Sequence, residues 1–229
     1  MKAFGGKPLS WYSSSAICFM ARQTNRIVLA ALGAAAVGGF LYARRNPSAC
    51  PYSQRWMIEI PKPGVSRARV LELLDPQPKE KLLELGPGTG YYSLDVAERL
   101  GDRGRLEIFD LQQEMLDHTM KRAQGAGITN IRDWQGDASQ PLIFEDNRFD
   151  GAFLVTVLGE IPDPDAALRE LARVVKPGGR VVFGEVAFDP HMVTLDSLKQ
   201  RVEAAGLRFE RKAGGPLGYV ARFAVPADG

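Results

Sequence analysis

The sequence predicts an α/β protein with one doubly wound, seven-stranded, mostly parallel sheet whose last strand runs antiparallel to the others. Three observations predict this fold. Short apolar runs alternate with helical patterns from residue 82 onward, as in parallel sheets with crossover helices. The first run breaks into a loop with glycine at every second position, from Gly86 to Gly90. Two closely spaced strand patterns, 207–212 and 218–225, end the chain and predict a closing hairpin.

The individual elements follow in regular order. Strands are expected at 82–85, 105–109, 130–135, 148–158 and 180–185, and helices at 111–124, 164–175 and 194–205. The helix at 164–175 is well defined, because Asp163 can cap its N-terminus and Pro164 suits its first position. Its apolar residues recur at i, i+3, i+4 and i+7, which gives the helix one face for burial.

The loop from Gly86 to Gly90 carries most of the functional information. Glycine has no Cβ, so the backbone can turn sharply and lie against a ligand. A dinucleotide-binding loop would read G-x-G-x-x-G, but its third glycine is replaced here by Tyr91. Glu84 precedes the loop and favours a cationic cofactor without phosphate, because an acid would repel a pyrophosphate. A strand–turn–helix corner that binds no ligand is the alternative.

The pattern E-x-G-x-G-x-G, which starts at Glu84, resembles that of the class I methyltransferases, which use S-adenosylmethionine. The F-D-x-apolar segment at Phe149 and the K-P-G-G segment at Lys176 are similar to the same family and extend the resemblance over about residues 67–226. The resemblance implies a Rossmann-like methyltransferase fold with S-adenosylmethionine as cofactor and no metal. It is specific for the fold and the cofactor, and unspecific for the substrate.

Acidic residues also follow the next two expected strands. Asp110 is placed to accept hydrogen bonds from ribose hydroxyls, and it can also cap the following helix with Gln113 in capping-box position. The resemblance places Asp137 beside the adenine amino group, although Gly136-Asp137 is by itself a turn signal. The cofactor contacts implied by the resemblance are Glu84, Gly86, Gly88, Gly90, Asp110, Leu111, Asp137, Ala138 and Leu154.

Candidates for the acceptor side of the site are few. The family often has two histidines after the fourth strand, where this chain has Gly159 and Glu160. Glu160 is a candidate base or substrate ligand, with a solvated loop acid as the alternative. His191 follows the fifth strand, where acceptor loops gather, and it could equally be an ordinary loop histidine. Candidate substrate contacts are Tyr52, Trp56 and Tyr91.

The N-terminal third has a different composition. Residues 27–43 contain no charged residue, and arginines flank the run on both sides. As a helix this run would be about 25 Å long, at the short end of a bilayer crossing. We therefore expect a basic tail at 1–26, a transmembrane helix at 27–43, a linker or substrate lid at 44–66 and a methyltransferase domain at 67–229. A cleaved targeting segment, or a true start at Met20, are the alternatives.

Charge supports the same division. Residues 1–45 hold six basic residues and no acid, which leaves 23 basic and 27 acidic residues and a formal charge of −4 for the rest. This distribution argues for a membrane surface and against nucleic acid. Because the methyl donor is made in the cytosol, the catalytic domain is expected to face the cytosol.

These observations predict a membrane-anchored methyltransferase that acts on a small apolar or amphipathic acceptor. The branch that it most resembles includes the ubiquinone/menaquinone-biosynthesis methyltransferases, so a quinone-like acceptor is expected. A phospholipid headgroup N-methyltransferase and an inactive, cofactor-binding assembly factor remain alternatives. An NAD-dependent oxidoreductase fits less well because of Tyr91. The oligomeric state is not indicated.

Overall fold

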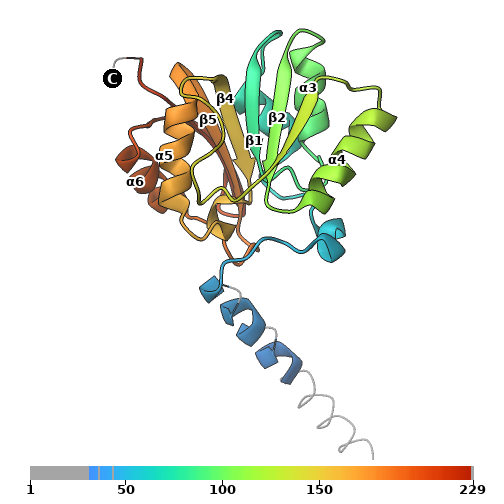
Figure 1. Ribbon diagram of the computed structural model, residues 1–229. Coiled ribbons are helices and arrows are strands. Elements are labelled where there is room, and N and C mark those ends of the chain that lie inside the picture. Colours follow the sequence, from blue (N-terminus) through green and yellow to red (C-terminus); the bar gives the residue numbers. More distant parts are fainter. Residues whose placement is uncertain (1–30, 36, 43, 228–229) are drawn as a thin grey trace, which may run out of the picture. The chain divides into compact units, whose positions relative to one another are not determined.

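The computed structural model describes residues 31–35, 37–42 and 44–227. The chain divides into two compact units, Met1–Arg45 and Asn46–Gly229. In the first unit, residues 31–35 and 37–42 are helical and exposed (Figure 1). The tail at 1–26 and part of the expected span, 27–30, 36 and 43, lie outside the described residues. Within the part of the chain that is described, no helix is both long enough and apolar enough to cross a membrane.

The second unit contains a seven-stranded sheet with the strand order β3-β2-β1-β4-β5-β7-β6. The strands are β1 (Lys81–Leu85), β2 (Arg105–Asp110), β3 (Ile131–Gln135), β4 (Phe149–Val155), β5 (Val175–Val186), β6 (Arg208–Gly215) and β7 (Gly218–Ala224). The first five strands pair in parallel, and β7 pairs antiparallel with both β5 and β6. The predicted mostly parallel sheet, with an antiparallel last strand in a closing hairpin, is confirmed.

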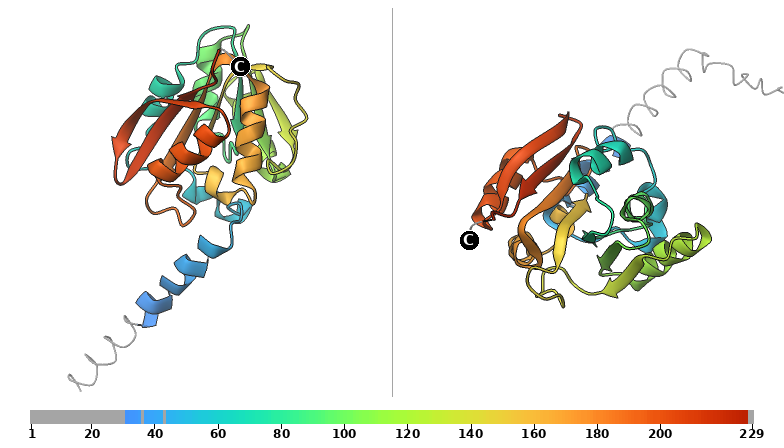
Figure 2. Two further views of the ribbon diagram at one scale, coloured as in Figure 1. Left: turned by 90° about the vertical axis from the view of Figure 1, so that its left-hand side faces the viewer. Right: turned by 90° about the horizontal axis from the view of Figure 1, so that it is seen from above.

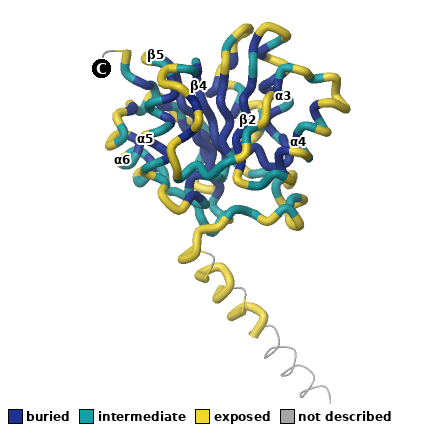
Figure 3. The backbone as a smooth tube through the Cα atoms, viewed as in Figure 1, coloured by how far each residue is buried: buried dark blue, intermediate teal, exposed yellow. Residues whose placement is uncertain are grey.

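Helices cover both faces of this sheet (Figures 1 and 2). They are α2 (Arg67–Leu74), α3 (Ser93–Leu100), α4 (Gln113–Gly125), α5 (Pro164–Val174) and α6 (Leu195–Ala204), with short 3₁₀ helices η1 (Tyr52–Met57) and η2 (Leu158–Glu160). One core cluster joins residues of α2, α3 and α4 to the sheet, and a second joins residues of α5 and α6 to it. The inner strands β1, β2 and β4 are therefore buried from both sides, as Figure 3 shows, which explains why they read as largely apolar runs. The edge strands β3 and β6 are more exposed.

Local boundaries differ from the prediction in three places. Helix α4 begins at Gln113, and its N-cap, Gln112, makes no side-chain capping bond, so the predicted capping box is wrong. Strand β5 begins at Val175, five residues before the expected start, because Val175 pairs with Phe149. Helix α2 was not predicted; it starts where the Ser66 side chain accepts a hydrogen bond from the backbone of Arg69.

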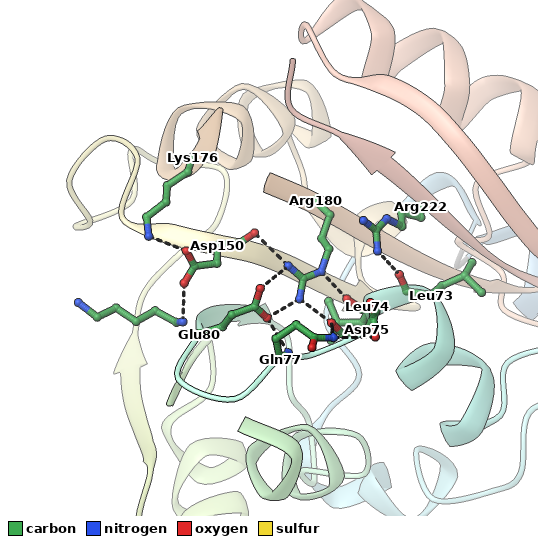
Figure 4. Close-up of polar contacts among 10 residues, drawn as sticks. Leu73, Leu74, Asp75, Gln77, Glu80, Asp150, Lys176, Arg180 and Arg222 are labelled. Atoms are coloured by element: carbon green, nitrogen blue, oxygen red, sulfur yellow. Dashed lines mark hydrogen bonds and ion pairs between the residues drawn. The ribbon is translucent and has the colours of Figure 1, made fainter. Parts of the chain in front are cut away.

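A polar network holds the edge of the sheet at which the parallel strands begin (Figure 4). The side chain of Arg180 in β5 lies 2.5 Å from Glu80 in an ion pair and also donates to the backbone oxygen of Leu74 at the end of α2. Asp150 in β4 accepts hydrogen bonds from Lys176 and from the backbone of Lys81 in β1. These charges satisfy one another, so this edge is structural, and the chemistry belongs to the opposite edge.

Candidate cofactor and acceptor site

The glycine loop after β1 adopts a conformation that requires its glycines. Gly86, Gly88 and Gly90 have φ values of 66°, 55° and 75°. A Cβ atom on Gly86 would lie 2.4 Å from the Val157 side chain, and one on Gly88 would lie 2.9 Å from the Ile58 side chain. Neighbouring side chains therefore occupy the space that a side chain at Gly86 or Gly88 would need. Among the described groups, the buried hydroxyl of Thr89 in this loop has no hydrogen-bond partner, which suits a loop that a ligand completes.

Glu84 stands at the end of β1 directly before the loop. It is only 3% exposed, and it accepts a hydrogen bond of 2.5 Å from the Ser93 hydroxyl. The pKa of Glu84 is raised to about 8, mainly by burial; the Ser93 hydrogen bond lowers it and the charge of Asp110 adds to the rise. A buried carboxyl in this state gains from a cationic partner. The ammonium group of S-adenosylmethionine is such a partner.

Asp110 ends β2, the strand beside β1. Its carboxylate accepts a hydrogen bond of 2.9 Å from the backbone of Gln112. Burial raises the pKa of Asp110, and backbone N–H groups of Gln112, Gly88 and Leu111 oppose the shift. The glycine loop and this acid are therefore in direct contact. The next residue, Leu111, is 55% exposed although it is apolar, so it offers a free surface to a flat ring such as adenine.

Asp137 follows β3, the next strand along the sheet, and its neighbour Gly136 donates a backbone hydrogen bond of 2.9 Å to the backbone oxygen of Asp110. Its carboxylate closes a turn by accepting from the backbone and the hydroxyl of Ser139, at 2.8 and 2.7 Å. Both the turn and the adenine interpretation of Asp137 are compatible with this geometry. Ala138 is partly buried against the core, and Leu154 is 1% exposed within the core, so the Leu154 side chain does not reach an open edge.

The acceptor candidates come together beyond β4. Glu160 ends η2, and burial, with Asp189 as the next cause, raises its pKa to about 8, whereas a hydrogen bond from the Cys50 backbone lowers it. Glu160 is thus half-buried beside Asp189 and the Cys50 backbone. The backbone oxygen of His191 would lie 1.8 Å from a Cβ at Gly159. This contact explains why glycine stands where the family often has histidine.

The loop after β5 contributes groups that the sequence did not indicate. Asp189 accepts a hydrogen bond of 2.8 Å from the His191 backbone, and its carboxylate lies 3.8 Å from the ring nitrogen Nδ1 of His191. Burial raises the pKa of Asp189 and of Glu185, which reaches about 8. Burial lowers the pKa of Lys62, and the charge of Asp189 opposes that shift. The D-P turn before His191 was the only local signal for Asp189.

Residues 50–62 form a strap across the glycine loop. Gln112 holds the strap, because its side chain accepts from the backbone of Tyr52 at 3.1 Å and donates to the backbone oxygen of Cys50 at 2.9 Å. Lys62 donates a hydrogen bond of 2.5 Å to the backbone oxygen of Ile58, whose side chain lies on Gly88. The strap therefore contacts both the glycine loop and Gln112, whose backbone in turn donates to Asp110. Gln112 was not predicted, since nothing in the local sequence marks it.

The three predicted substrate contacts occupy different positions. The Tyr52 hydroxyl lies 3.4 Å from Nδ1 of His118, which fixes Tyr52 beside α4. Trp56 is 63% exposed. Tyr91 lies beneath the Arg67 guanidinium, 4.1 Å from the ring centre, and packs edge-on against Tyr92. Of the three, Tyr91 is nearest in sequence to the glycine loop.

The sheet order, the glycine loop and the acids at the ends of β1 and β2 and after β3 resemble those of class I S-adenosylmethionine-dependent methyltransferases. Residues 82–179 match the family model described as a methyltransferase domain. The cofactor of this enzyme class is S-adenosylmethionine, and the NAD-dependent alternative is not supported.

Among curated relatives, the chain is 31% identical over 125 residues to the ubiquinone/menaquinone biosynthesis C-methyltransferase of Shewanella frigidimarina, which covers 55% of this chain and 50% of that protein. It is 33% identical over 127 residues to the demethylmenaquinone methyltransferase of Bacillus pumilus, which covers 56% and 53%. The chain thus spans about half the length of these relatives.

Solved structures show the same fold. A SAM-dependent methyltransferase from Aquifex aeolicus aligns with a TM-score of 0.66 and 20% identity, over 77% of this chain and 100% of that one. A putative methyltransferase from Bacillus halodurans aligns with a TM-score of 0.62 and 16% identity, over 71% and 100%. At these identities the likeness defines the fold and leaves the acceptor open.

Proposed function

We propose that this protein transfers the methyl group of S-adenosylmethionine to a small apolar or amphipathic acceptor, of which a quinone-like ring is the best candidate. One observation carries the proposal. The glycine loop with Glu84 and Asp110 lies beneath the same strap that brings a backbone N–H to Glu160, so a cofactor subsite and a proton-accepting group share one edge of the sheet. The names of the curated relatives support a quinone-like acceptor.

On the cofactor side, each residue has a distinct task in this proposal. Asp110 would hold the ribose hydroxyls, Glu84 the ammonium group and Asp137 the adenine amino group, while Leu111 would lie against the adenine ring. Ionised carboxylates suit all three polar contacts because they only accept hydrogen bonds. When bound, the cofactor supplies an electrophilic methyl group on a sulfonium. The glycine loop allows the backbone to approach the cofactor closely.

On the acceptor side, the strap and the groups beyond β4 and β5 would enclose the reacting atom and exclude water. A ring carbon or hydroxyl that gains a methyl group must lose a proton. Glu160, whose pKa is raised to about 8, would accept that proton in its ionised form, which predominates above about pH 8, and His191 is a second candidate. In this proposal residues 44–66 act as the lid.

An amine acceptor, such as a phospholipid headgroup, is the second candidate. The observation in its favour is that burial raises the pKa values of Glu160, Glu185 and Asp189, and that the charge of Asp189 raises those of Glu160 and Glu185 further. Lys62 is the cation that lowers the pKa of Asp189. A cationic amine would relieve this repulsion.

We also propose that residues 27–43 attach the protein to a membrane and that the second unit faces the cytosol. The uncharged run and the acid-free, basic composition of residues 1–45 support this proposal. Its test is extraction of the full chain from membranes. Retention after an alkaline carbonate wash is expected, and full release would contradict anchoring.

A labelled-methyl assay tests the function. Purified protein and methyl-labelled S-adenosylmethionine are offered membranes and cytosol separately, and the labelled product is identified. A labelled quinone-like lipid from membranes is expected, and the Glu160→Gln variant should form far less of it. A labelled phospholipid would favour the amine acceptor. If cofactor binds but no label is transferred, the protein is an inactive cofactor-binding factor and the proposal fails.

A further inference from the structure

Large apolar side chains are exposed around the edge of the sheet that carries the glycine loop. Among the described residues of the second unit, 46–227, seven large apolar residues are exposed: Trp56, Met57, Ile60, Leu111, Ile143, Phe188 and Leu217. Leu111 belongs to the cofactor subsite, and Ile143 lies in the connection between β3 and β4. We call the remaining five residues, Trp56, Met57, Ile60, Phe188 and Leu217, the apolar rim.

The contacts of the rim place its members on this one edge. Met57 and Ile60 flank Ile58, whose side chain lies against Gly88. Phe188 follows the last residue of β5, Val186. The β6–β7 hairpin turns at the same edge, because Gly218 pairs with Val186 and the backbone oxygen of Leu217 accepts a hydrogen bond of 3.1 Å from Ala187. In Figure 1 the strap runs along the lower end of the sheet, where these strands end.

The exposed side chains of the apolar rim indicate that the rim binds a partner. Trp56 and Leu217 are both 63% exposed and Phe188 is 56% exposed. Single exposed apolar residues are normal on a protein surface, but a group of them along one edge of a domain marks an interaction site. Aromatic and aliphatic side chains of this size are also those that insert between lipid headgroups.

Charge indicates which partner fits. The chain enters this unit at Asn46, four residues before the strap, and the preceding residues 1–45 carry six basic residues and no acid. The strap itself carries Arg55 and Lys62. Its acid, Glu59, is paired with Arg122 at 3.1 Å. Apolar side chains beside Arg55, in a chain whose first 45 residues are basic and free of acids, match the surface of an anionic bilayer.

We propose that the apolar rim docks the second unit onto the surface of an anionic phospholipid bilayer, so that a lipid acceptor passes from the membrane into the site. The route of the acceptor rests on the proposed function, whereas the docking of the rim does not. The rim binds lipid in addition to any attachment through residues 27–43.

Vesicle binding of the full chain tests the docking. The vesicles contain equal parts of phosphatidylcholine and phosphatidylglycerol, or phosphatidylcholine alone. The double variant Trp56→Ser/Phe188→Ser is compared with Ile143→Ser, a matched control because Ile143 is 62% exposed outside the rim. We expect the double variant to bind anionic vesicles at least about tenfold more weakly, since each buried apolar side chain contributes strongly. The control should bind like the wild type.

A second measurement does not depend on the N-terminal segment. Brominated phospholipids quench tryptophans that enter the bilayer, and the Trp56 contribution is the difference between the wild type and Trp56→Phe. Quenching of Trp56 is expected. The absence of quenching, together with equal vesicle binding by the double variant and the control, would overturn the docking. A lipid-independent dimer that the double variant loses would also overturn it and make the rim an interface between copies.

The activity arm separates this inference from the proposed function. The activity arm uses Leu217→Ser, because Leu217 is 63% exposed in the β6–β7 hairpin and lies outside the proposed lid. This variant should lose turnover on an acceptor held in vesicles and keep it on a short-chain acceptor in solution. Equal loss on both would make the rim part of the acceptor pocket and would overturn the docking. Absence of transfer to every acceptor, with vesicle binding as expected, would remove the proposed function and leave the docking in place.

Discussion

Glu84→Gln is the sharpest test of the electrostatics at the cofactor loop. In the folded protein the pKa of Glu84 is raised by burial to about 8, from the ordinary value of 4.5. Between these values the unfolded chain has lost the Glu84 proton and the folded chain retains it, so the unfolded state binds fewer protons. The free energy of unfolding must therefore fall as pH rises through this window.

The size of the effect follows from the same two pKa values. One pKa unit corresponds to about 1.4 kcal/mol, so between about pH 5 and pH 8 the Glu84 carboxyl should lower the free energy of unfolding by about 3 kcal/mol. Other buried carboxyls, Glu160 and Glu185, act in the same direction. For this reason the informative quantity is the difference between the wild type and Glu84→Gln, because the glutamine has no proton to lose.

Urea unfolding of the cofactor-free protein, followed by circular dichroism in steps of one pH unit, measures this difference. Glu84→Gln should gain stability relative to the wild type as pH rises. Calorimetry adds a second readout, because the cofactor ammonium should release the Glu84 proton. At neutral pH the wild type should release close to one more proton per bound S-adenosylmethionine than the variant. Parallel stability curves and equal proton release would refute the reasoning.

Three further predictions concern the loop, the acceptor groups and the strap. Gly86→Ala should be less stable than Gly101→Ala by about 1–3 kcal/mol in urea unfolding and should bind less cofactor. Both glycines have positive φ, but only Gly86 faces a side chain, that of Val157. An equal loss of unfolding free energy in the two variants would show that the contact with Val157 is unimportant. The wild-type rate of methyl transfer should decrease as the pH drops below about 8, because Glu160 then holds a proton, and Glu160→Gln should remove this limb of the pH–rate profile. An unchanged profile in the variant would exclude Glu160 as the base. Gln112→Ala removes two hydrogen bonds to the strap, worth about 1 kcal/mol each, so amide exchange at Tyr52 should accelerate and the KM for the acceptor should rise. The control Gln113→Ala should do neither, because its side chain bonds Asp117 on its own helix. Unchanged amide exchange at Tyr52 in Gln112→Ala would contradict the role of Gln112 in holding the strap.

The sheet was predictable because its signals are local. Buried parallel strands read as apolar runs, and the loop between Glu84 and Gly90 follows from glycine spacing alone. The two acids after β1 and β2 could be identified for the same reason, since the end of a parallel strand is visible in the sequence. The hairpin of β6 and β7 was also signalled, by a short glycine-rich connection between two strand patterns.

The acceptor side could not be predicted, because it depends on contacts between distant segments. Gln112 looks like any polar residue at a helix start, yet it binds the backbone of Tyr52, sixty positions earlier. Asp189 raises the pKa of Glu160 only because the loop after β5 lies against Gly159. The start of α4 was missed since Asp110 bonds the Gln112 backbone, which delays the helix by two residues.

Calorimetric titration with S-adenosylmethionine tests the central claim most directly, because the claim is that acids at adjacent strand ends hold this cofactor. The wild type should bind one equivalent, and NAD should give no heat. Asp110→Ala should bind at least about tenfold more weakly while its cofactor-free unfolding changes little, since a charged hydrogen-bond acceptor is lost from the ligand. A wild type that does not bind, or an Asp110→Ala variant that binds equally well, would contradict the account.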